Sequence, residues 1–291
     1  MSLQKKLLPE NLVKQWWFNS GSLIDQHFKG TPSLTSKKLV YYNQSRGNTQ
    51  ISYRQGASLE DFLIKTGRWY SQLICTSHPA ITIGEAQITI LSPTESVLSK
   101  LSENWADYFK EKKDTQINRR EHDFNTSIEE LARRSYIRDP SLVNQSSIAF
   151  LFELKGTRLI FLADATPEIY LAALKKLIEV RNLKKLAINA VKLAHHAGKH
   201  NFLPELLDLI DCQHFLISTD GSRHMLPNKE TLAKIILHPE RQPGAHTFFH
   251  FNYKNTLLQH IFDKNIALLH NFQCVFPVPS ENGSNLEWND D

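Results

Sequence analysis

The sequence predicts an α/β fold in which helices cover both faces of a largely parallel sheet. This prediction depends on the alternation of apolar, strand-like segments with helical segments in the second half of the chain. Short apolar runs bounded by turn residues indicate buried strands, and strands that alternate with helices are typical of parallel sheets. The expected strands are 148–154, 158–163, 186–194, 214–218, 246–253 and 266–269, and the expected helices are 166–180, 204–210 and 229–237.

Turn and capping residues set the boundaries of these elements. Lys155-Gly156-Thr157 separates the first two strands and predicts a hairpin. Pro167 stands in the first turn of the helix that follows, a position that proline tolerates because its missing N–H has no partner there. Asn228 is expected to cap the helix that begins at Lys229.

The first 110 residues carry weaker signals. Residues 13–18 are a possible strand, and Ser58 is expected to cap a helix that runs to about Leu73. Residues 80–91 alternate apolar and polar side chains around Gly84-Glu85 and predict a second hairpin. Pro93 then opens a helix that reaches about Lys110.

The bulk properties are those of an ordinary globular protein. The chain has 291 residues, of which 41% are hydrophobic and 22% charged, enough to bury a sizeable core. The net charge of +4 does not by itself indicate a nucleic-acid-binding protein. No apolar signal segment follows Met1, and no run is long enough for a membrane span, so we expect a cytoplasmic protein without membrane contact. Three widely spaced cysteines indicate reduced thiols.

Composition divides the chain into four parts. Residues 111–145 are rich in charged and polar residues and predict either a solvated insertion with one short helix or a partly mobile loop. It separates an N-terminal half, 1–110, from a C-terminal half, 146–275. The polar residues 276–291 are expected to form a flexible tail.

Three polar sites follow predicted buried strands, where α/β sheets place their ligands. Asp164 ends the second strand, His195 and His196 end the third with His200 in the next loop, and Ser218 ends the fourth with His224 beyond it. Each site also has an explanation that involves no ligand. Asp164 could cap a helix, the histidines could form a hydrogen-bonded pair in a loop, and Ser218 could be part of a turn. Neutral imidazoles beside a carboxylate are suitable ligands for zinc, manganese or iron.

The order of these sites resembles the second half of the metallo-β-lactamase fold, in its ComEC-like branch, named for the DNA-uptake hydrolase domain. Asn144-Gln145-Ser146-Ser147 precedes the hairpin, as the Asn-x-x-Ser segment of that branch does. Ala163-Asp164 occupies the position where that branch has Gly-Asp, and Lys192 to His200 matches Lys-x-x-His-His-Gly-Ser. Ser218 to Pro227 matches the last element, Ser-x-x-Gly with His-Pro. The resemblance covers 142–237 and extends more weakly over 13–110.

The resemblance implies an αββα sandwich and a metal-dependent hydrolase of phosphodiesterase type. It implies that Asp164 bridges two divalent ions, zinc or manganese, and that His195 is a terminal ligand of one of them. A bridging hydroxide would attack a phosphoester or an acyl group, and a phosphoester or nucleic acid is the implied substrate. Asn144, His196, His200, Ser218 and His224 would contact the substrate or support the ligands by hydrogen bonds.

The sequence departs from this family at the metal site. None of the thirteen histidines lies in the family's His-x-His-x-Asp-His motif, which precedes the equivalent of Trp17-Phe18-Asn19, so the fold is expected to lack its first strands. Ala163 and Ala197 replace glycines, Gly198 replaces serine, and Leu226 replaces the histidine before Pro227. Zinc sites need at least three protein ligands, so Asp164 and His195 alone predict weak or lost metal binding.

Three functions remain open from the sequence. The first is an incomplete or degenerate metallo-hydrolase with little activity as an isolated chain. The second is half of a two-chain hydrolase, whose partner supplies the missing strands. The third is a non-catalytic interaction subunit that uses the former active-site edge or the segment 111–145 to hold a partner. Basic pairs at Arg119-Arg120 and Arg133-Arg134 could contact nucleic acid, although a solvated surface is the commoner explanation of such pairs.

Overall fold

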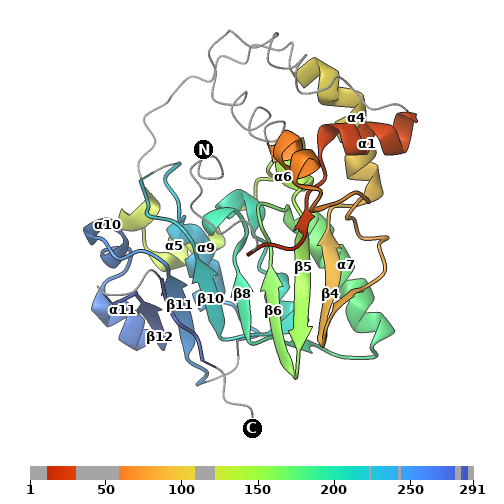
Figure 1. Cartoon of the computed structure of the whole chain (residues 1–291). Coiled ribbons are helices and arrows are strands. Elements are labelled where there is room, and N and C mark those ends of the chain that lie inside the picture. The colour runs from red at the N-terminus through yellow and green to blue at the C-terminus, as the bar shows by residue number, and fades with distance from the viewer. Residues whose placement is uncertain are drawn as a thin grey trace. The chain divides into compact units, whose positions relative to one another are not determined.

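Figure 1 shows the computed structural model of the chain. The chain forms two compact units. The smaller unit comprises residues 1–74 and 95–117, and the larger one residues 75–94 and 118–291. The residues that the structure describes are 12–30, 59–108, 122–222, 224–241, 244–278 and 283–287.

The smaller unit joins two helices through a buried polar contact. Its elements are β1 (Trp16–Trp17), α1 (Gly21–Lys29), a helix over 59–66, β2 (Trp69–Tyr70) and α4 (Glu95–Tyr108). Asp25 of α1 accepts hydrogen bonds from Lys29 Nζ (3.0 Å) and from Ser102 Oγ of α4 (2.5 Å). The Ser20 side chain caps α1 by accepting from the backbone N–H of Leu23.

The helix expected to reach Leu73 ends earlier, so that part of the prediction is wrong. Gly67 adopts a φ of 63°, and its N–H donates to Leu63 O, which closes the last turn. The chain then enters β2, which pairs in parallel with β1. Ser58, the expected cap, lies outside the described residues. The expected strand 13–18 is present only as the two residues of β1.

The larger unit is built on an eight-stranded mixed sheet with the strand order β12-β11-β10-β8-β6-β5-β4-β3. The strands are β3 (Ile81–Ile83), β4 (Ala86–Ser92), β5 (Ala149–Leu154), β6 (Thr157–Phe161), β8 (Ala190–Lys192), β10 (His214–Ile217), β11 (Thr247–Phe251) and β12 (Phe272–Val275). The pairs β3–β4, β4–β5 and β5–β6 are antiparallel. Strands β6, β8, β10, β11 and β12 run parallel to one another. A mixed α/β fold is therefore confirmed.

Helices and short turns connect these strands. They are η2 (Asp123–Asn125), α5 (Ile128–Arg133), α6 (Leu142–Gln145), α7 (Pro167–Val180), η3 (Ala194–His196), η4 (Lys199–Asn201), α8 (Leu206–Leu209), α9 (Lys229–Ile236), α10 (Thr256–Gln259) and α11 (Lys264–Leu269). A separate two-stranded sheet pairs β7 (Leu186–Ala187) with β9 (Ile210–Asp211).

Both predicted hairpins are confirmed. The β3–β4 turn has Gly84 at a φ of 61°, and the β5–β6 turn has Lys155 and Gly156 at 47° and 87°. Two-residue hairpin turns need such positive φ values because their twist must match that of the strands. The predicted helix 166–180 is also confirmed, as α7.

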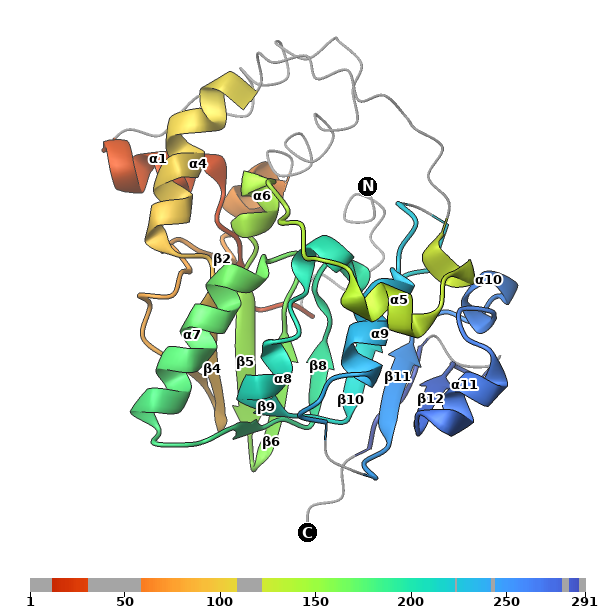
Figure 2. The same ribbon diagram turned by 180° about the vertical axis from the view of Figure 1, so that it is seen from behind.

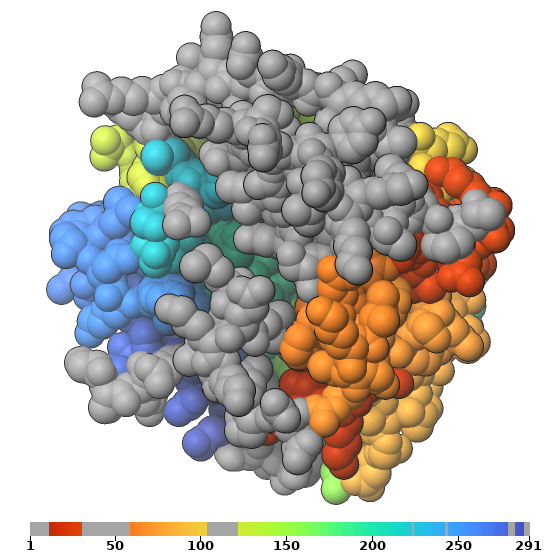
Figure 3. Space-filling view, turned by 45° about the horizontal axis from the view of Figure 1, so that its top comes forward, coloured from red at the N-terminus to blue at the C-terminus, as the bar shows by residue number. Residues whose placement is uncertain are grey.

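Two other expectations are wrong. Residues 186–194 are not one strand: β7 and β8 belong to different sheets, and Asn189 between them bonds the backbone of Arg158 through its side chain. Residues 266–269 are helical, within α11, because Asp263 caps that segment by accepting from Asn265 N. This helix leaves Leu268 and Leu269 about four-fifths exposed, at 82% and 78%. The blue atoms of the C-terminal elements lie at the surface in Figure 3.

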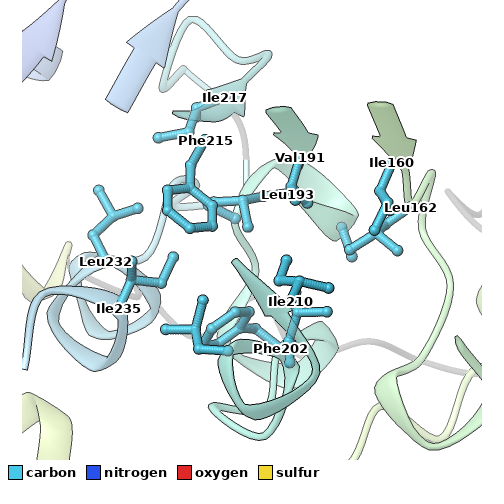
Figure 4. Packing of buried hydrophobic residues seen from close by; sticks show 14 of the residues in the cluster. Ile160, Leu162, Val191, Leu193, Phe202, Ile210, Phe215, Ile217, Leu232 and Ile235 are labelled. Carbon is cyan, nitrogen blue, oxygen red and sulfur yellow. The ribbon is translucent and has the colours of Figure 1, made fainter. Parts of the chain in front are cut away.

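The core of the larger unit lies between the sheet and the helices α5, α7, α8 and α9, which cover the same face of the sheet in Figure 2. Figure 4 shows side chains of β6, β8 and β10 meeting those of α9 and of the segment before α8. The labelled residues are Ile160, Leu162, Val191, Leu193, Phe202, Ile210, Phe215, Ile217, Leu232 and Ile235.

Residues 122–145, the described part of the expected polar insertion, contribute to this core. Ile128 and Leu131 of α5 are fully buried in it. Both carboxylate oxygens of Asp123 accept from the first backbone N–H groups of α9, those of Lys229 and Glu230, each at 2.9 Å. The Lys229 ammonium in turn donates to Phe124 O at 2.7 Å. Residues 111–121 lie outside the described ranges.

Candidate functional site

The polar turns predicted from the sequence lie at the C-terminal ends of neighbouring strands in the large sheet. Strands β6, β8 and β10 are neighbours and run parallel, so their C-terminal ends point the same way, as the arrowheads in Figure 1 show. The turns with Asp164, His195 and Ser218 follow these three strands. The His195 N–H donates to Ala163 O at 2.8 Å, which joins the first two turns directly. We call these three turns, at the C-terminal ends of β6, β8 and β10, the rim.

The rim backbone is unusual because several residues other than glycine adopt positive φ. The values are 47° at Ala163, 43° at His195, 56° at His196 and 68° at Ala197. This left-handed region costs free energy for any residue with a Cβ atom, and such residues gather at functional sites, where surrounding contacts hold them. In the loop between β10 and α9, His224 and Met225 also have positive φ, at 59° and 56°.

Asp139 is the centre of a hydrogen-bond network that supports these turns. Its Oδ2 accepts from Asn144 Nδ2 at 2.7 Å and from Asn201 Nδ2 at 3.0 Å, and its Oδ1 accepts from Ser141 N at 2.8 Å. Burial opposes the charged carboxylate, but these hydrogen bonds outweigh it and hold the pKa of Asp139 below its ordinary value. Asn201 also donates to Asp164 O at 3.2 Å, so one buried amide links Asp139 to the Asp164 turn.

His195 is held from the side of Asp139. Its Nδ1 lies 3.3 Å from Asn144 Nδ2 and 3.9 Å from Asp139 Oδ2. The imidazole is about one-third exposed, at 31%, so it remains accessible from the rim. The structure therefore brings Asn144 and His195, which the sequence singled out, into direct contact, and it places Asp139, which the sequence did not single out, beside both.

His196 belongs to a separate contact on the β10 side. Its Nδ1 lies 3.1 Å from Ser218 Oγ. Burial lowers the pKa of His196, and the nearby Lys192 charge lowers it further, while Asp164 acts in the opposite direction. The neutral form of this ring is thus favoured at neutral pH.

Lys192 places a partly buried ammonium group at the same rim. Burial lowers the pKa of Lys192 to about 8, and the Asp164 carboxylate opposes this shift. Its Nζ donates to Leu193 O at 2.8 Å. Asp164 therefore acts electrostatically on both Lys192 and His196, which places its carboxylate near both side chains.

The other two predicted residues lie towards the periphery. His200 Nδ1 contacts Ile137 O at 2.7 Å, so this ring faces the loop before Asp139. His224 is exposed in the loop between β10 and α9, and it takes no part in the described hydrogen-bond network around Asp139. Asn228, the expected cap of α9, instead accepts from Lys199 N at 2.9 Å, and Asp123 caps that helix.

The donor set does not fit a resident dinuclear metal centre. Within the described ranges, which contain all thirteen histidines and all three cysteines, no three His, Cys, Asp or Glu side chains gather at a possible metal site. Asp164 and His195 would supply only two ligands, one fewer than zinc sites usually need. Burial raises the pKa of Cys212 and of Cys274 to about 12, which disfavours the thiolate form that binds metals.

Asp139, Asn201 and Lys192 complete the site, and sequence reasoning assigned none of them a role. Asp139 follows no strand, so strand-end logic could not find it, whereas Lys192 stands inside the His-His motif.

Two cavities lie elsewhere in the larger unit. One, between β4 and α7, is lined by Ile90, Ile169 and Val180, and the other, at the opposite ends of β10 and β11, by Gln213, Arg241 and Thr247.

Comparison with protein-family models, with curated proteins and with solved structures found no match to this chain. None of the helices in the described parts has both the length and the apolar content that a membrane span requires. The rim geometry and the sequence pattern are therefore the grounds on which a function is assigned.

Proposed function

We propose that this chain is an incomplete or degenerate relative of the metallo-β-lactamase-fold hydrolases, of the ComEC-like branch, that keeps the rim of the active site with a reduced set of metal ligands. The isolated chain then binds zinc or manganese weakly and has little hydrolase activity. The natural substrate class of the rim is a phosphoester.

The observation that carries this proposal is the backbone of the two turns after β6 and β8. Ala163 and Ala197 stand where the resembled family has glycine, and both adopt positive φ, at 47° and 68°. Glycine is the residue that adopts this conformation without steric cost. Both alanines of this chain adopt positive φ, the conformation that explains why the resembled family has glycine at these positions.

The order of the turns gives further support. Asp164, the His195-His196 pair and Ser218 follow neighbouring parallel strands, and a backbone hydrogen bond of 2.8 Å joins the first two turns. The αββα sandwich itself is part of the proposal. The eight-stranded sheet of the larger unit, with helices over one face, is the feature that supports this part of the proposal.

Metal analysis of the purified chain tests the proposal. After dialysis against zinc and then against metal-free buffer, we expect clearly less than one metal ion per chain, because two ligands do not hold zinc tightly. The Asp164→Ala variant should lose the residual binding, and Asp220→Ala, which changes an exposed carboxylate in the turn after β10, should not. Two tightly bound ions per chain would contradict the proposal.

A two-chain enzyme is the second candidate, and the edge of the sheet favours it. β3 lies at the edge of the sheet and leaves Ile83 54% exposed, an apolar surface that further strands of a partner chain would cover. If a partner chain supplies further strands and ligands, co-expression with the adjacent gene product should yield phosphodiesterase activity. That activity should vanish in Asp164→Ala. A complex that forms without any gain of activity would leave the first candidate.

A further inference from the structure

The cavity at the N-terminal ends of β10 and β11 lies at the end of β10 that is opposite the rim. Its volume is about 410 Å³, within the range of roughly 300 to 1,000 Å³ that is typical of small-molecule sites. The small β7–β9 sheet lines it on one side, and the first residues of β10 and β11 line it on another. Its inner wall is apolar, formed by the buried side chains of Leu207, Ile210, Phe215 and Ile235, of which Figure 4 shows the last three in the core.

Arg241 brings a guanidinium group to the wall of this cavity. Its Nη1 donates to Ile236 O at 3.2 Å and to His270 O at 2.7 Å, and its Nη2 donates to Ala245 O at 3.0 Å and to Asn271 O. A guanidinium group has five N–H donors. The fifth, on Nε, is buried and has no partner among the residues that the structure describes.

The charge of Arg241 is not neutralised by the protein around it, since its four acceptors are uncharged carbonyl groups. Burial lowers the pKa of Arg241, and no carboxylate of the described residues opposes that shift. Asp211 and Glu240 also line the cavity, so neither of them compensates the guanidinium, and Glu240 Oε2 lies instead 3.4 Å from Lys185 Nζ. With Lys184, three cations and two carboxylates line the cavity, which leaves its lining positive overall.

Two polar side chains beside Arg241 have unused hydrogen-bonding groups. Thr247 is the first residue of β11, and its N–H donates to Asn271 O at 3.2 Å, the same oxygen that Arg241 contacts. Gln213 immediately precedes β10, the parallel neighbour of β11. Thr247 is only 3% exposed, and in the described part of the chain neither its hydroxyl nor the Gln213 amide has a hydrogen-bond partner. A buried hydroxyl without a partner costs free energy, so an oxygen atom of a ligand would be favoured there.

We propose that this cavity binds a small organic oxyanion, a carboxylate or a phosphate ester with a hydrocarbon part. Its oxygens accept hydrogen bonds from the Thr247 hydroxyl and the Gln213 amide beside the guanidinium group of Arg241, because donors next to an uncompensated cation favour a charged acceptor. The hydrocarbon part packs on Phe215 and Ile235. The site is separate from the rim and goes beyond the function proposed for it.

An NMR titration of the full chain tests the proposal with hydrocinnamate and phenyl phosphate as the two oxyanions. We expect both to shift the Arg241 Nε–H signal, assigned with an Arg241→Lys variant, and the backbone signals of Gln213 and Thr247. The tighter of the two identifies the preferred head group, while the backbone signals of Asp164 and His195 report separately on the rim. Hydrocinnamamide has nearly the same shape and no charge, and it should bind at least about tenfold more weakly than hydrocinnamate.

Two variants test the contacts themselves. Thr247→Val removes the hydroxyl and keeps the shape of the side chain, and it should weaken hydrocinnamate binding by about tenfold, because a hydrogen bond to a charged group is lost. Gln213→Met should weaken it in the same direction, and this position is exposed, so the variant tests the site even if Thr247→Val is unstable. Thr89→Val is the matched control, a half-buried threonine of β4 that lines the other cavity, and it should keep the wild-type affinity.

Any of three results would overturn the inference. The first is the absence of shifts at Gln213, Arg241 and Thr247 at about 10 mM of either oxyanion, a concentration that nearly saturates a site of millimolar affinity. The second is equal affinity for hydrocinnamate and hydrocinnamamide, and the third is wild-type affinity in both Thr247→Val and Gln213→Met. None of these results bears on the proposed function, which metal analysis tests at the rim.

Discussion

Ala163 has a φ of 47°, a conformation in which its Cβ atom crowds the backbone. The residue is exposed, so its methyl group gains little from burial. Its carbonyl oxygen accepts the His195 N–H, and that hydrogen bond requires the turn to keep this shape. The rim therefore holds one alanine in a strained position for the sake of a contact between two turns.

Glycine at this position should relieve the strain. We expect Ala163→Gly to raise the free energy of unfolding by about 1 kcal/mol, since glycine adopts positive φ without the steric cost. Ala165→Gly is the opposite-sign control: that alanine is fully buried and has no positive φ, so its loss should destabilise the protein. Urea unfolding of both variants decides the matter, and a destabilised Ala163→Gly would mean that the turn is not left-handed in solution.

His250 and His214 form a cross-strand contact between β11 and β10. His214 Nδ1 lies 2.9 Å from His250 Nε2, and the ring of His214 stacks on Phe248 with centroids 4.8 Å apart. His250 is only 6% exposed, and its other nitrogen, Nδ1, is buried without a described partner. Burial, and then the neighbouring His214, lower the pKa of His250 from 6.5 to about 4.

This pair predicts a loss of stability in acid. Because the folded pKa of His250 lies below its unfolded value, the unfolded chain takes up a proton that the folded protein refuses, and the contribution present above pH 6.5 is lost as the pH falls towards 4. In urea titrations across this range, His250→Phe should show a smaller loss of unfolding free energy than the wild type. His260→Phe, at an exposed position, should keep the wild-type dependence. Parallel curves for His250→Phe and the wild type would contradict this assignment.

The N-terminus of α9 is capped from a distant part of the chain. Asp123 accepts from the backbone N–H groups of Lys229 and Glu230, more than one hundred residues away. A carboxylate at this end of a helix is also favoured by the helix dipole. The segment before α5 is thereby fixed to the core of the larger unit.

Removing this cap should cost about 0.5–2 kcal/mol of unfolding free energy, the range measured for N-caps. Asp123→Asn should cost less than Asp123→Ala, because the amide keeps one oxygen acceptor. Thermal unfolding of the two variants tests this order. If Asp123→Ala has the wild-type midpoint, the helix end is satisfied by other groups.

On the scale of the whole molecule, the larger unit depends on a hairpin that precedes most of its sequence. β4 pairs with β5 from Gln87 to Ser92, and it also packs against α7. Ile88, Ile90 and Leu91 of β4 are buried. A chain that begins after this hairpin would expose the edge of β5 and part of the core.

Two fragments test this dependence. Residues 75–291 contain the whole larger unit and should give a dispersed amide NMR spectrum and cooperative unfolding. Residues 118–291 lack β3 and β4 and should aggregate or unfold without cooperativity, because an uncovered strand edge favours association. A stable, monomeric 118–291 fragment would show that the hairpin is dispensable.

The sequence by itself determined the α/β class, the two hairpins, α7 and the strand-end positions of Asp164, His195 and Ser218. These features are local, since side-chain periodicity and turn residues act within a few positions of one another. The same local logic failed at 266–269, where an apolar run of four residues fits a strand or a helix and the cap at Asp263 decides.

Only the tertiary structure revealed Asp139 and Asn201, which support the rim, and the cap that Asp123 gives to α9. It also separated β7 from β8, which pair with different sheets. The physical reason is that a buried hydrogen bond gains its strength from a partner that the fold brings near, and the residues between the two partners do not specify that partner. The local sequence set which polar groups end the strands, whereas the assembled sheet set which of them meet.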